Sequence, residues 1–462
     1  MTFKTILTAA EMRAAEAAAV AAGTPDTELM ERAGIAAADA ILAYAGWLPA
    51  LILCGPGNNG GDGYVIARRL AERGAKVRVA ALAEPATAAA RQARARWSGP
   101  VEALDEASPA PVLIDALFGT GLTRGLDEPL SQILFRLANA ARLAVAVDLP
   151  SGVATDDGAL LSPVPDFDLT ISFATLKPAH LLQPAARHMG RLVVADIGLD
   201  ADSRLETVER PLLVGPGPAD HKYSRGYVAV LAGEMPGAAA LTASASLRCG
   251  AGYVRLVAPA VVEGVPRAVV QGGADAEAVL ADPRVSAIAI GPGLGRDAAA
   301  RTLLDRALGA EAKLVLDADA LTLAAEEGFG FLHRARMPPV LTPHAGEFAR
   351  LFADRRGSKV DQARRAAEQA RSVIVYKGPD TVVAAPDGRV AIAVSAPHWL
   401  ATAGTGDVLT GVIAAMRAWG LEAFEAACAG VWLHGRAAEI AGPGLIADDL
   451  LDHLPEAFAQ CL

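Results

Sequence analysis

Short aliphatic runs alternate with stretches of helical periodicity along most of the chain. Apolar positions at helical spacing predict two helices within residues 1–45. Beyond them, apolar runs such as "ALILC" (50–54), "PVLIDAL" (111–117) and "LAVAVDL" (143–149) are separated by amphipathic segments. Strands that alternate with helices predict a mostly parallel sheet with helices on both faces. The pattern therefore predicts an α/β fold.

This alternation stops near Gly198 and starts again with "GYVAVLAG" at 226–233. The segment between them holds charged residues, Pro and Gly without periodicity, which is typical of a linker. A length of 462 residues also suits two domains. We predict a first domain over 1–205, a linker over 206–221 and a second domain over 222–462, each built on its own mostly parallel sheet.

One apolar stretch, residues 35–54, is long enough to suggest a membrane span. Asp39 lies inside it, however, and Gly46 and Pro49 interrupt it. We therefore predict a helix, a turn and a buried strand over 50–54. The first residues carry one lysine and only a short apolar patch, so no signal peptide is expected either.

Composition narrows the class of ligand. A net charge of −10 argues against nucleic acid as a partner, but glycine loops can bind phosphate through backbone N–H groups whatever the net charge. The four cysteines form no CxxC pair. We expect reduced thiols in a cytoplasmic protein, without a zinc site or disulfides.

The densest glycine run is "GPGNNGGDG" at 55–63, which follows the first predicted strand. It contains a formal GxGxxG motif, and Glu84 lies near the spacing of a ribose-binding acid, so a dinucleotide loop of a dehydrogenase is one interpretation. Asp62, however, would repel a pyrophosphate, and Asn58 and Asn59 are larger than a close-approach loop requires.

Two further loops are predicted at the same edge of the sheet, outside the carboxyl ends of the strands. The glycines of "DALFGTGLTRG" (115–125) permit a nest of backbone donors, to which Arg124 can add a charged fork. In "DLPSG", Asp148 ends an apolar strand. The side chains of Asn59, Asp115 and Ser151 offer hard oxygen ligands that suit an alkali or alkaline-earth cation.

Together with the opening "LTAAEMRAAE", these motifs resemble, in order and spacing, the NAD(P)H-hydrate epimerase domain of YjeF-type repair proteins, over about 1–205. The resemblance implies a Rossmann-like fold and exchange of the R and S epimers of hydrated NADH and NADPH. It implies that the substrate is bound by Asn58, Asn59, Gly60, Gly61, Asp62, Gly119, Thr120, Gly121, Leu122, Thr123, Arg124, Gly125 and Asp148, and potassium by Asn59, Asp115 and Ser151. We predict Asp148 as the catalytic acid/base. The route, by ring opening or through a cation, stays open, and a silent nucleotide-binding module is the alternative.

The second glycine run, "AGTGDVLTG" at 403–411, opens an apolar helix. Gly404, Thr405 and Gly406 free backbone amides to form an anion hole beside Asp407. A carboxylate next to a phosphate cradle suits a base that deprotonates a hydroxyl attacking a phosphoryl group. This arrangement resembles the ribokinase-like folds, and no P-loop lysine motif is present.

Several segments of the second half resemble, in the same order, the NAD(P)H-hydrate dehydratase family over about 215–462: "KYSRGYV", "GEMPGAAALTASASLRCGAGYV", "IGPGLG", "LDADAL", "LTPHAGEF" and "VYKGPDTVV". The resemblance implies nucleotide binding by Lys377, Gly378, Pro379, Asp380, Thr381 and Gly406, and substrate binding by Ala238, Gly295, His344 and Asp407. Asp407 would be the catalytic base. Ala345 departs from the proline that the family often has there, which should loosen one turn.

We therefore predict a bifunctional metabolite-repair enzyme that epimerises hydrated NADH and NADPH and dehydrates the S form. Because a fused chain of this order resembles bacterial members, we expect ADP with magnesium as co-substrate, giving AMP and phosphate. We also expect self-association into a homo-oligomer and no membrane partner. The alternative is a small-alcohol or vitamin kinase fused to a non-catalytic nucleotide-binding module.

Overall fold

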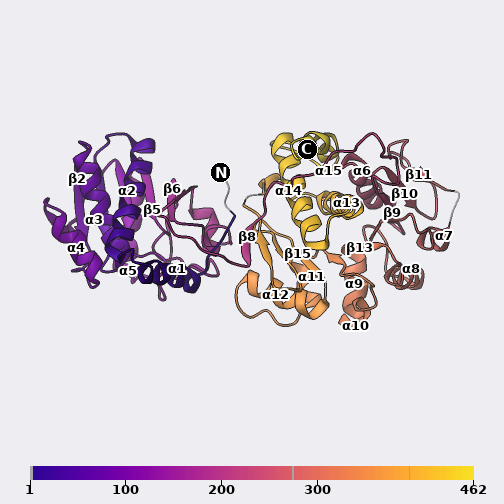
Figure 1. The fold of residues 1–462 in the computed structure, drawn as a ribbon, viewed down its shortest axis with the longest axis horizontal. Coiled ribbons are helices and arrows are strands. Elements are labelled where there is room, and N and C mark those ends of the chain that lie inside the picture. Colours follow the sequence, from indigo (N-terminus) through magenta and orange to yellow (C-terminus); the bar gives the residue numbers. More distant parts are fainter. Residues whose placement is uncertain (1–3, 273–274, 395) are drawn as a thin grey trace. The chain divides into compact units, whose positions relative to one another are not determined.

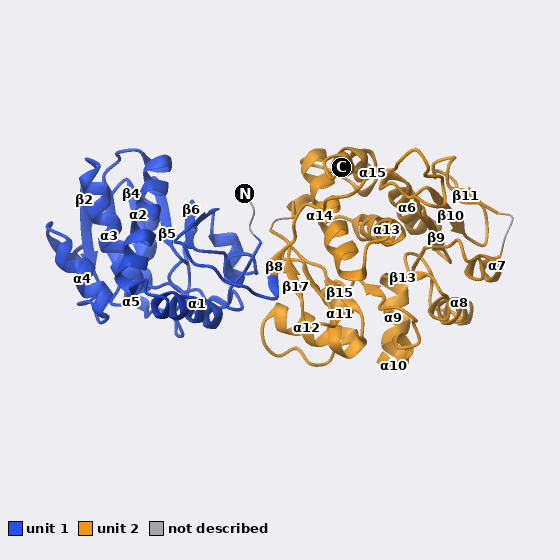
Figure 2. Cartoon of the chain, viewed as in Figure 1, with its two compact units in different colours: residues 1, 3–205 blue, residues 2, 206–462 orange. Residues whose placement is uncertain are grey.

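The computed structural model describes residues 4–272, 275–394 and 396–462. The chain forms two compact units, the first ending at Leu205 and the second beginning at Glu206 (Figure 2). Each unit carries its own sheet, with helices on both faces (Figure 1). The predicted α/β fold with two mostly parallel sheets is confirmed.

Unit 1 contains five helices and seven strands among its described residues. The helices are α1 (Ala9–Ala21), α2 (Asp26–Ala45), α3 (Asn58–Glu72), α4 (Ala88–Arg96) and α5 (Glu128–Ala140), with short 3-10 turns η1 (Leu104–Glu106), η2 (Pro178–His180) and η3 (Ala185–His188). The strands are β1 (Ala50–Cys54), β2 (Val77–Ala81), β3 (Val101–Ala103), β4 (Val112–Ala116), β5 (Leu143–Val147), β6 (Leu169–Phe173) and β7 (Arg191–Ala195).

The first sheet is parallel throughout, in the order β3-β2-β1-β4-β5-β6-β7. Side chains of β1 alternate between two cores: Ile52 packs with α2 and α3, and Leu53 packs with α5. This alternation explains why the strand is an unbroken apolar run, since helices cover both faces. The strand order reverses between β1 and β4, so the loops after these strands diverge and leave a crevice for a ligand.

The apolar stretch 35–54, which is long enough to suggest a membrane span, divides as predicted. It forms the end of α2, a turn at Gly46 with φ of 59°, and buried β1. No helix within the described residues has both the length and the apolar character that a membrane crossing requires.

In the described part of the chain, the second sheet contains ten strands, and helices from the same unit flank it. Its strands are β8 (Leu205–Thr207), β9 (Tyr227–Leu231), β10 (Tyr253–Val257), β11 (Val270–Gln271), β12 (Ala287–Ile290), β13 (Lys313–Leu316), β14 (Val340–Leu341), β15 (Val373–Tyr376), β16 (Val382–Ala384) and β17 (Val390–Ile392). The helices are α6 (Pro236–Arg248), α7 (Ala276–Leu280), α8 (Ala298–Leu308), α9 (Ala318–Glu327), α10 (Phe329–Leu332), α11 (Ala345–Leu351), α12 (Lys359–Ala370), α13 (Thr405–Ala418), α14 (Ala423–Ala441) and α15 (Ala447–Ala459), with the 3-10 turn η4 (His398–Leu400).

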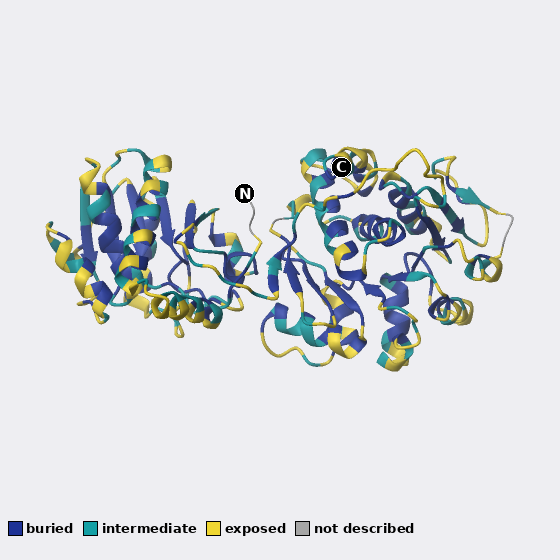
Figure 3. Cartoon of the chain, in the orientation of Figure 1, coloured by how far each residue is buried: buried dark blue, intermediate teal, exposed yellow. Residues whose placement is uncertain are grey.

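The order of the second sheet is β11-β10-β9-β12-β13-β14-β15-β16-β17-β8. It is parallel from β11 to β15, and the β15-β16 and β16-β17 pairs are antiparallel. Helix α13 is buried almost all round, which its apolar sequence predicts. In both units the strands are mostly buried, and the outer faces of the surrounding helices are exposed (Figure 3).

The structure adds strands that the hydrophobic pattern did not predict: β3, β8, β11 and β16. The apolar run "VAIAVSA" at 390–396 predicts a strand longer than β17, which ends at Ile392, and position 395 of that run lies outside the described residues. The predicted linker 206–221 begins within β8, after which residues 208–226 contain no helix or strand.

Candidate functional site

The glycine run that follows β1 is the start of a helix and not an open loop, because α3 begins at Asn58. Its glycines are needed for packing. A Cβ at Gly60 would lie 1.8 Å from the carbonyl oxygen of Gly55, and a Cβ at Gly55 equally close to that of Leu117. The hydrophobic pattern predicts an amphipathic helix only from Tyr64 onward. That start is wrong, because the glycines let the first turns of α3 pack closely against neighbouring backbone.

Asp148 lies immediately after β5, at the carboxyl edge of the sheet, and is almost fully buried. Its φ of 64° is a left-handed conformation that a residue with a side chain adopts only when its surroundings hold it. One carboxylate oxygen accepts a hydrogen bond from the backbone N–H of Thr120 at 3.0 Å. A Cβ at Gly119 would lie 2.7 Å from the same oxygen and 3.0 Å from Oδ1 of Asn59, so these two side chains converge over Gly119.

Lys177 is the partner of the other carboxylate oxygen of Asp148, at 2.8 Å. Its side chain is fully buried, and its ammonium also donates to Oγ of Ser172 at 3.0 Å and to the carbonyl of Phe173 at 2.9 Å. Three acceptors thus take the three protons of the ammonium group. Sequence reasoning missed Lys177, although a lysine that follows the buried run of β6 was a usable signal.

His180, also missed, contacts the backbone on either side of this pair. Its Nδ1 accepts from the N–H of Lys177 at 2.8 Å, and its Nε2 lies 2.7 Å from the carbonyl oxygen of Asp148. Because Nδ1 is an acceptor, Nε2 carries the ring proton and donates it to that carbonyl. Burial, and then the charge of Lys177, lower the pKa of His180 to about 4, so the ring stays neutral.

The acidic groups around Asp148 differ in ionisation. Burial alone would raise the pKa of Asp148, but Lys177, His180 and the Thr120 N–H outweigh it and lower the pKa. Burial, followed by the charges of Asp148 and Glu16, raises the pKa of Asp62 well above its usual range. Burial and Asp148 also raise the pKa of Glu16 on α1. The crevice therefore contains an ionised carboxylate beside carboxyl groups that tend to hold protons.

Asp115 and Ser151 meet at the ends of β4 and β5. The hydroxyl of Ser151 donates to Asp115 at 2.8 Å, and the N–H groups of Ser151 and Leu117 donate to the same carboxylate. Burial raises the pKa of Asp115 to about 6 despite these bonds. The side-chain nitrogen of nearby Asn59 is buried without a hydrogen-bond partner among the described residues. A bound cation would stabilise the charged form of this buried carboxylate. Because the ligand atoms nearby are hard oxygens, the residues fit a monovalent or alkaline-earth ion.

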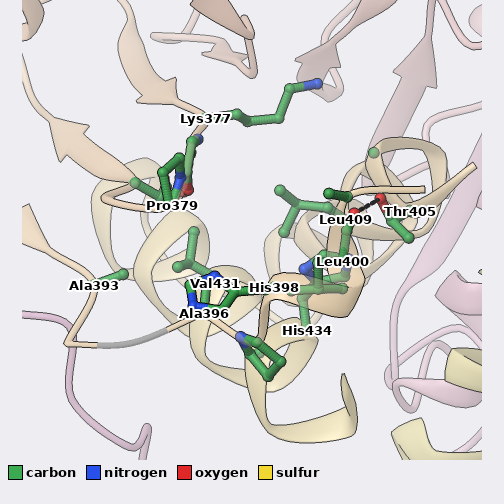
Figure 4. A pocket seen from close by; sticks show the side chains of 16 residues that line it. Lys377, Pro379, Ala393, Ala396, His398, Leu400, Thr405, Leu409, Val431 and His434 are labelled. Atoms are coloured by element: carbon green, nitrogen blue, oxygen red, sulfur yellow. Dashed lines mark hydrogen bonds between the residues drawn. The ribbon is translucent and has the colours of Figure 1, made fainter. Parts of the chain in front are cut away.

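The second candidate site surrounds the start of α13. Gly404, with φ of 88°, turns the chain so that the helix begins at Thr405 and Asp407 falls in its first turn. A cavity of about 450 Å³ opens here (Figure 4). The lining residues come from the loop after β15, from the segment before α13 and from α13 and α14: Lys377, Gly378, Pro379, Thr381, Ala393, Ala396, Pro397, His398, Leu400, Ala401, Thr405, Gly406, Leu409, Val431, His434 and Gly435.

Most of the residues predicted for the nucleotide lie on this cavity, but Asp380 is not part of its lining. The carboxylate of Asp380 is buried and forms an ion pair with Lys359 at 2.5 Å. Lys377 lies 2.9 Å from Asp317, whose second oxygen accepts from Thr410 at 2.8 Å. A Cβ at Gly406 would lie 3.3 Å from the Lys377 ammonium, which places that charge at the mouth of α13.

Asp407 is partly buried and interacts with two other carboxylates, Asp317 and Glu347. Burial first, and then the charges of Asp317 and Glu347, raise its pKa to about 6, against the opposing effect of Lys377. A carboxyl group with a pKa near the working pH can gain and lose a proton, which is what general-base catalysis needs. Sequence reasoning did not single out Asp317 or Glu347 as the groups that produce this shift.

The residues predicted for the second unit's substrate lie on separate elements. Ala238 is in the first turn of α6, whose Thr242 hydroxyl donates to the carbonyl of Asp407 at 3.0 Å. Gly295 follows β12 with φ of 82°. His344 caps α11: its Nδ1 accepts from the N–H of Gly346 at 3.0 Å, and its side chain is more than half exposed.

Two protein-family models match the chain: "YjeF-related protein N-terminus" over residues 26–179 and "NAD(P)H-hydrate dehydratase" over residues 228–456. A protein named bifunctional NAD(P)H-hydrate repair enzyme Nnr from Thermofilum pendens is 37% identical over 94% of this chain and 92% of its own. A protein of the same name from Mycobacterium tuberculosis H37Rv is 36% identical, over 90% and 89% respectively. Among solved structures, the ADP/ATP-dependent NAD(P)H-hydrate dehydratase from Bacillus subtilis, co-crystallised with ATP/Mg²⁺, is 30% identical with a TM-score of 0.47, covering 54% of this chain and 95% of that one.

Proposed function

The chain belongs to the family of bifunctional NAD(P)H-hydrate repair enzymes, with epimerase and dehydratase activities, and from this we propose which residues carry each activity. Unit 1, which contains the match to the YjeF-related model, would exchange the epimers. Unit 2, which contains the match to the dehydratase model, would remove water from the S epimer. The observation that carries the dehydratase proposal is the position of Asp407, a carboxyl of raised pKa in the first turn of α13 beside Lys377.

In the dehydratase half, Asp407 would accept the proton of the substrate hydroxyl. The oxygen of that hydroxyl would attack the terminal phosphoryl group of the nucleotide at the same time. The bond from that phosphorus to the rest of the nucleotide breaks. Phosphate then leaves the ring carbon, a proton leaves the neighbouring carbon, and the ring double bond is restored. Lys377 and the backbone N–H groups at the start of α13 would hold the negative charge of the phosphates.

We propose ADP as the phosphoryl donor, with magnesium bound to its phosphates. The cavity supports an adenine nucleotide, because its volume suits a ligand of that size and apolar Leu400, Leu409 and Val431 can contact a base. The positively charged end of the cavity lies at Lys377. Ala238, Gly295 and His344 would contact the hydrated coenzyme on the other side of Asp407, and the enzyme would act in the cytoplasm, where both ligands occur.

The test is to incubate S-epimer hydrate with the protein, magnesium and either ADP or ATP, and to identify the nucleotide and phosphorus products. Restoration of reduced coenzyme with ADP, together with AMP and orthophosphate, would support the proposal. A stable phosphorylated product would instead identify a kinase of small alcohols. Restoration with ATP alone would refute the choice of ADP.

The dehydration rate should depend on pH through Asp407. A base must be ionised to accept a proton, so the rate is expected to be highest well above about pH 6 and to fall about tenfold per unit below it. Measuring kcat/KM for the S epimer from about pH 4.5 to about pH 8 checks this. Unchanged tryptophan fluorescence over the range would exclude unfolding, and a profile without an acidic limb would contradict the assignment.

In the epimerase half, we propose that Asp148 moves the proton of the ring hydroxyl while the configuration at the hydrated carbon is exchanged, whichever route the exchange takes. Residues 58–62 and 119–125 would bind the substrate around it. Potassium would be held by Asn59, Asp115 and Ser151 and would supply a fixed positive charge beside the bound coenzyme. Self-association of the chain stays a prediction.

A further inference from the structure

Two residues without an assigned role, Lys177 and His180, surround Asp148. Lys177 immediately precedes η2 and His180 is its last residue, and this turn lies a few residues beyond the end of β6. Lys177 contacts the side chain of Asp148 and His180 contacts its main chain. One short turn therefore reaches the same residue from two directions.

Every polar atom of Asp148 is bonded in this arrangement. Its N–H donates to the carbonyl of Ile171 at 2.7 Å, and its carbonyl accepts from His180. Its two carboxylate oxygens accept from Lys177 and from the N–H of Thr120. A left-handed backbone at a residue with a side chain costs about 1–3 kcal/mol. The hydrogen bonds to all four polar atoms of Asp148 together offset that cost and hold the conformation.

The buried ammonium of Lys177 cannot act directly on a substrate, because its side chain has no exposed surface and its three protons are already donated. It can act through Asp148. A cation at 2.8 Å favours the charged carboxylate over the neutral acid. The ring of His180 is neutral above about pH 4, so its main part is to fix orientation.

We propose that Lys177 and His180 are positioning residues of the epimerase: Lys177 keeps Asp148 ionised, so that it begins the reaction as a base, and His180 fixes the direction in which its carboxylate points. The proposal rests on the assignment of Asp148 made above and names the protonation state in which that residue works. Among the described residues, the other titratable groups that interact with Asp148 are Asp62 on α3 and Glu16 on α1, and Arg13 acts on Glu16.

The first test follows the ionisation of Asp148 directly. In the full chain labelled with ¹³C at aspartate side-chain carboxyls, the Asp148 signal is assigned by its loss in Asp148→Asn and titrated by NMR. In the unchanged protein it should titrate below the ordinary aspartate value, because Lys177 stabilises the charged form. In Lys177→Met it should titrate at least about one pH unit higher, because burial then acts without its counter-charge. Lys177→Gln repeats the comparison should the methionine variant fail to fold.

The second test separates orientation from charge. His180→Phe keeps a ring of similar shape but removes both hydrogen bonds, so kcat for epimer exchange should fall about tenfold or more, with KM within about twofold. The Asp148 titration should move less than it does in Lys177→Met, because His180 lowers the pKa of Asp148 less than Lys177 does. His188→Phe is the matched control, since His188 is also buried in unit 1 but bonds to Asp166 and Arg187. The dehydration rate of each variant, measured in the same samples, gives the amount of intact protein by which its exchange rate is normalised.

Two results would overturn the inference: an Asp148 that titrates at or above the ordinary aspartate value in the unchanged protein, or His180→Phe exchange equal to that of His188→Phe. Failure of the underlying assignment looks different. If Asp148→Asn exchanges epimers at the full rate, the proposed epimerase site is wrong whatever the NMR titration gives.

Discussion

Replacement of Asp407 by asparagine is expected to lower nucleotide-dependent restoration of NADH from its hydrate by about 10³-fold. Asparagine keeps the shape of the side chain but cannot accept the proton of the substrate hydroxyl. Epimer exchange in unit 1 should be unchanged, because Asp407 belongs to unit 2. The measurement is the recovery of reduced-nicotinamide absorbance, with chromatography of the two epimers in the same samples.

Asp452→Asn is the matched control for this variant, since Asp452 is exposed on α15 and should restore NADH at the full rate. A rate for Asp407→Asn within about tenfold of the unchanged protein would contradict the role of Asp407 as the base. Binding of ADP to the variant should persist, because asparagine removes no contact that we assign to the phosphates.

Replacement of Asp148 by asparagine is expected to reduce epimer exchange by about 10²- to 10³-fold. It should also lower Tm, because buried Lys177 loses its counter-charge, and breaking a buried pair costs about 3–5 kcal/mol. Dehydration of the S epimer should continue. A mixture of epimers should then be repaired only until the S form is consumed, which chromatography of the remaining substrate will show.

Asp39→Asn serves as the control in unit 1, since Asp39 is half exposed on α2 and its ion pairs among the described residues are with Arg69 and Arg73. Full exchange by Asp148→Asn, at a temperature where the variant is folded, would favour a silent module in unit 1. A Tm equal to that of the unchanged protein would contradict the energetic role of the Lys177 pair.

Much of this architecture could be predicted from the sequence, because it depends on local patterns. Apolar runs buried on both faces placed β1, β4 and β5 correctly. The places of Asp148 after a buried strand and of Asp407 in a glycine-rich helix start could be predicted from local sequence, whereas their catalytic roles stay predictions. The family resemblance, which the comparisons confirm, rests on the same motifs.

The remainder depends on contacts between distant residues. Lys177 lies 29 residues from Asp148, and Lys377 lies 60 residues from Asp317, so no local spacing indicates either pair. Strands as short as β11 and β16 exist only beside their neighbours and leave little periodicity. The start of α3 was misplaced because glycine disfavours helices by propensity, whereas here close packing against Gly55 requires it.

The central claim is that one chain carries two separate activities, one dependent on Asp148 and the other on Asp407. The most direct measurement adds the Asp148→Asn and Asp407→Asn proteins, alone and together, to mixed epimers of hydrated NADH with ADP and magnesium. Alone, the first should repair only the S form and the second neither form. Together they should restore NADH from both epimers, because the S form made by one protein is free to reach the other. Recovery by the mixture that stops at the level of Asp148→Asn alone would contradict the account.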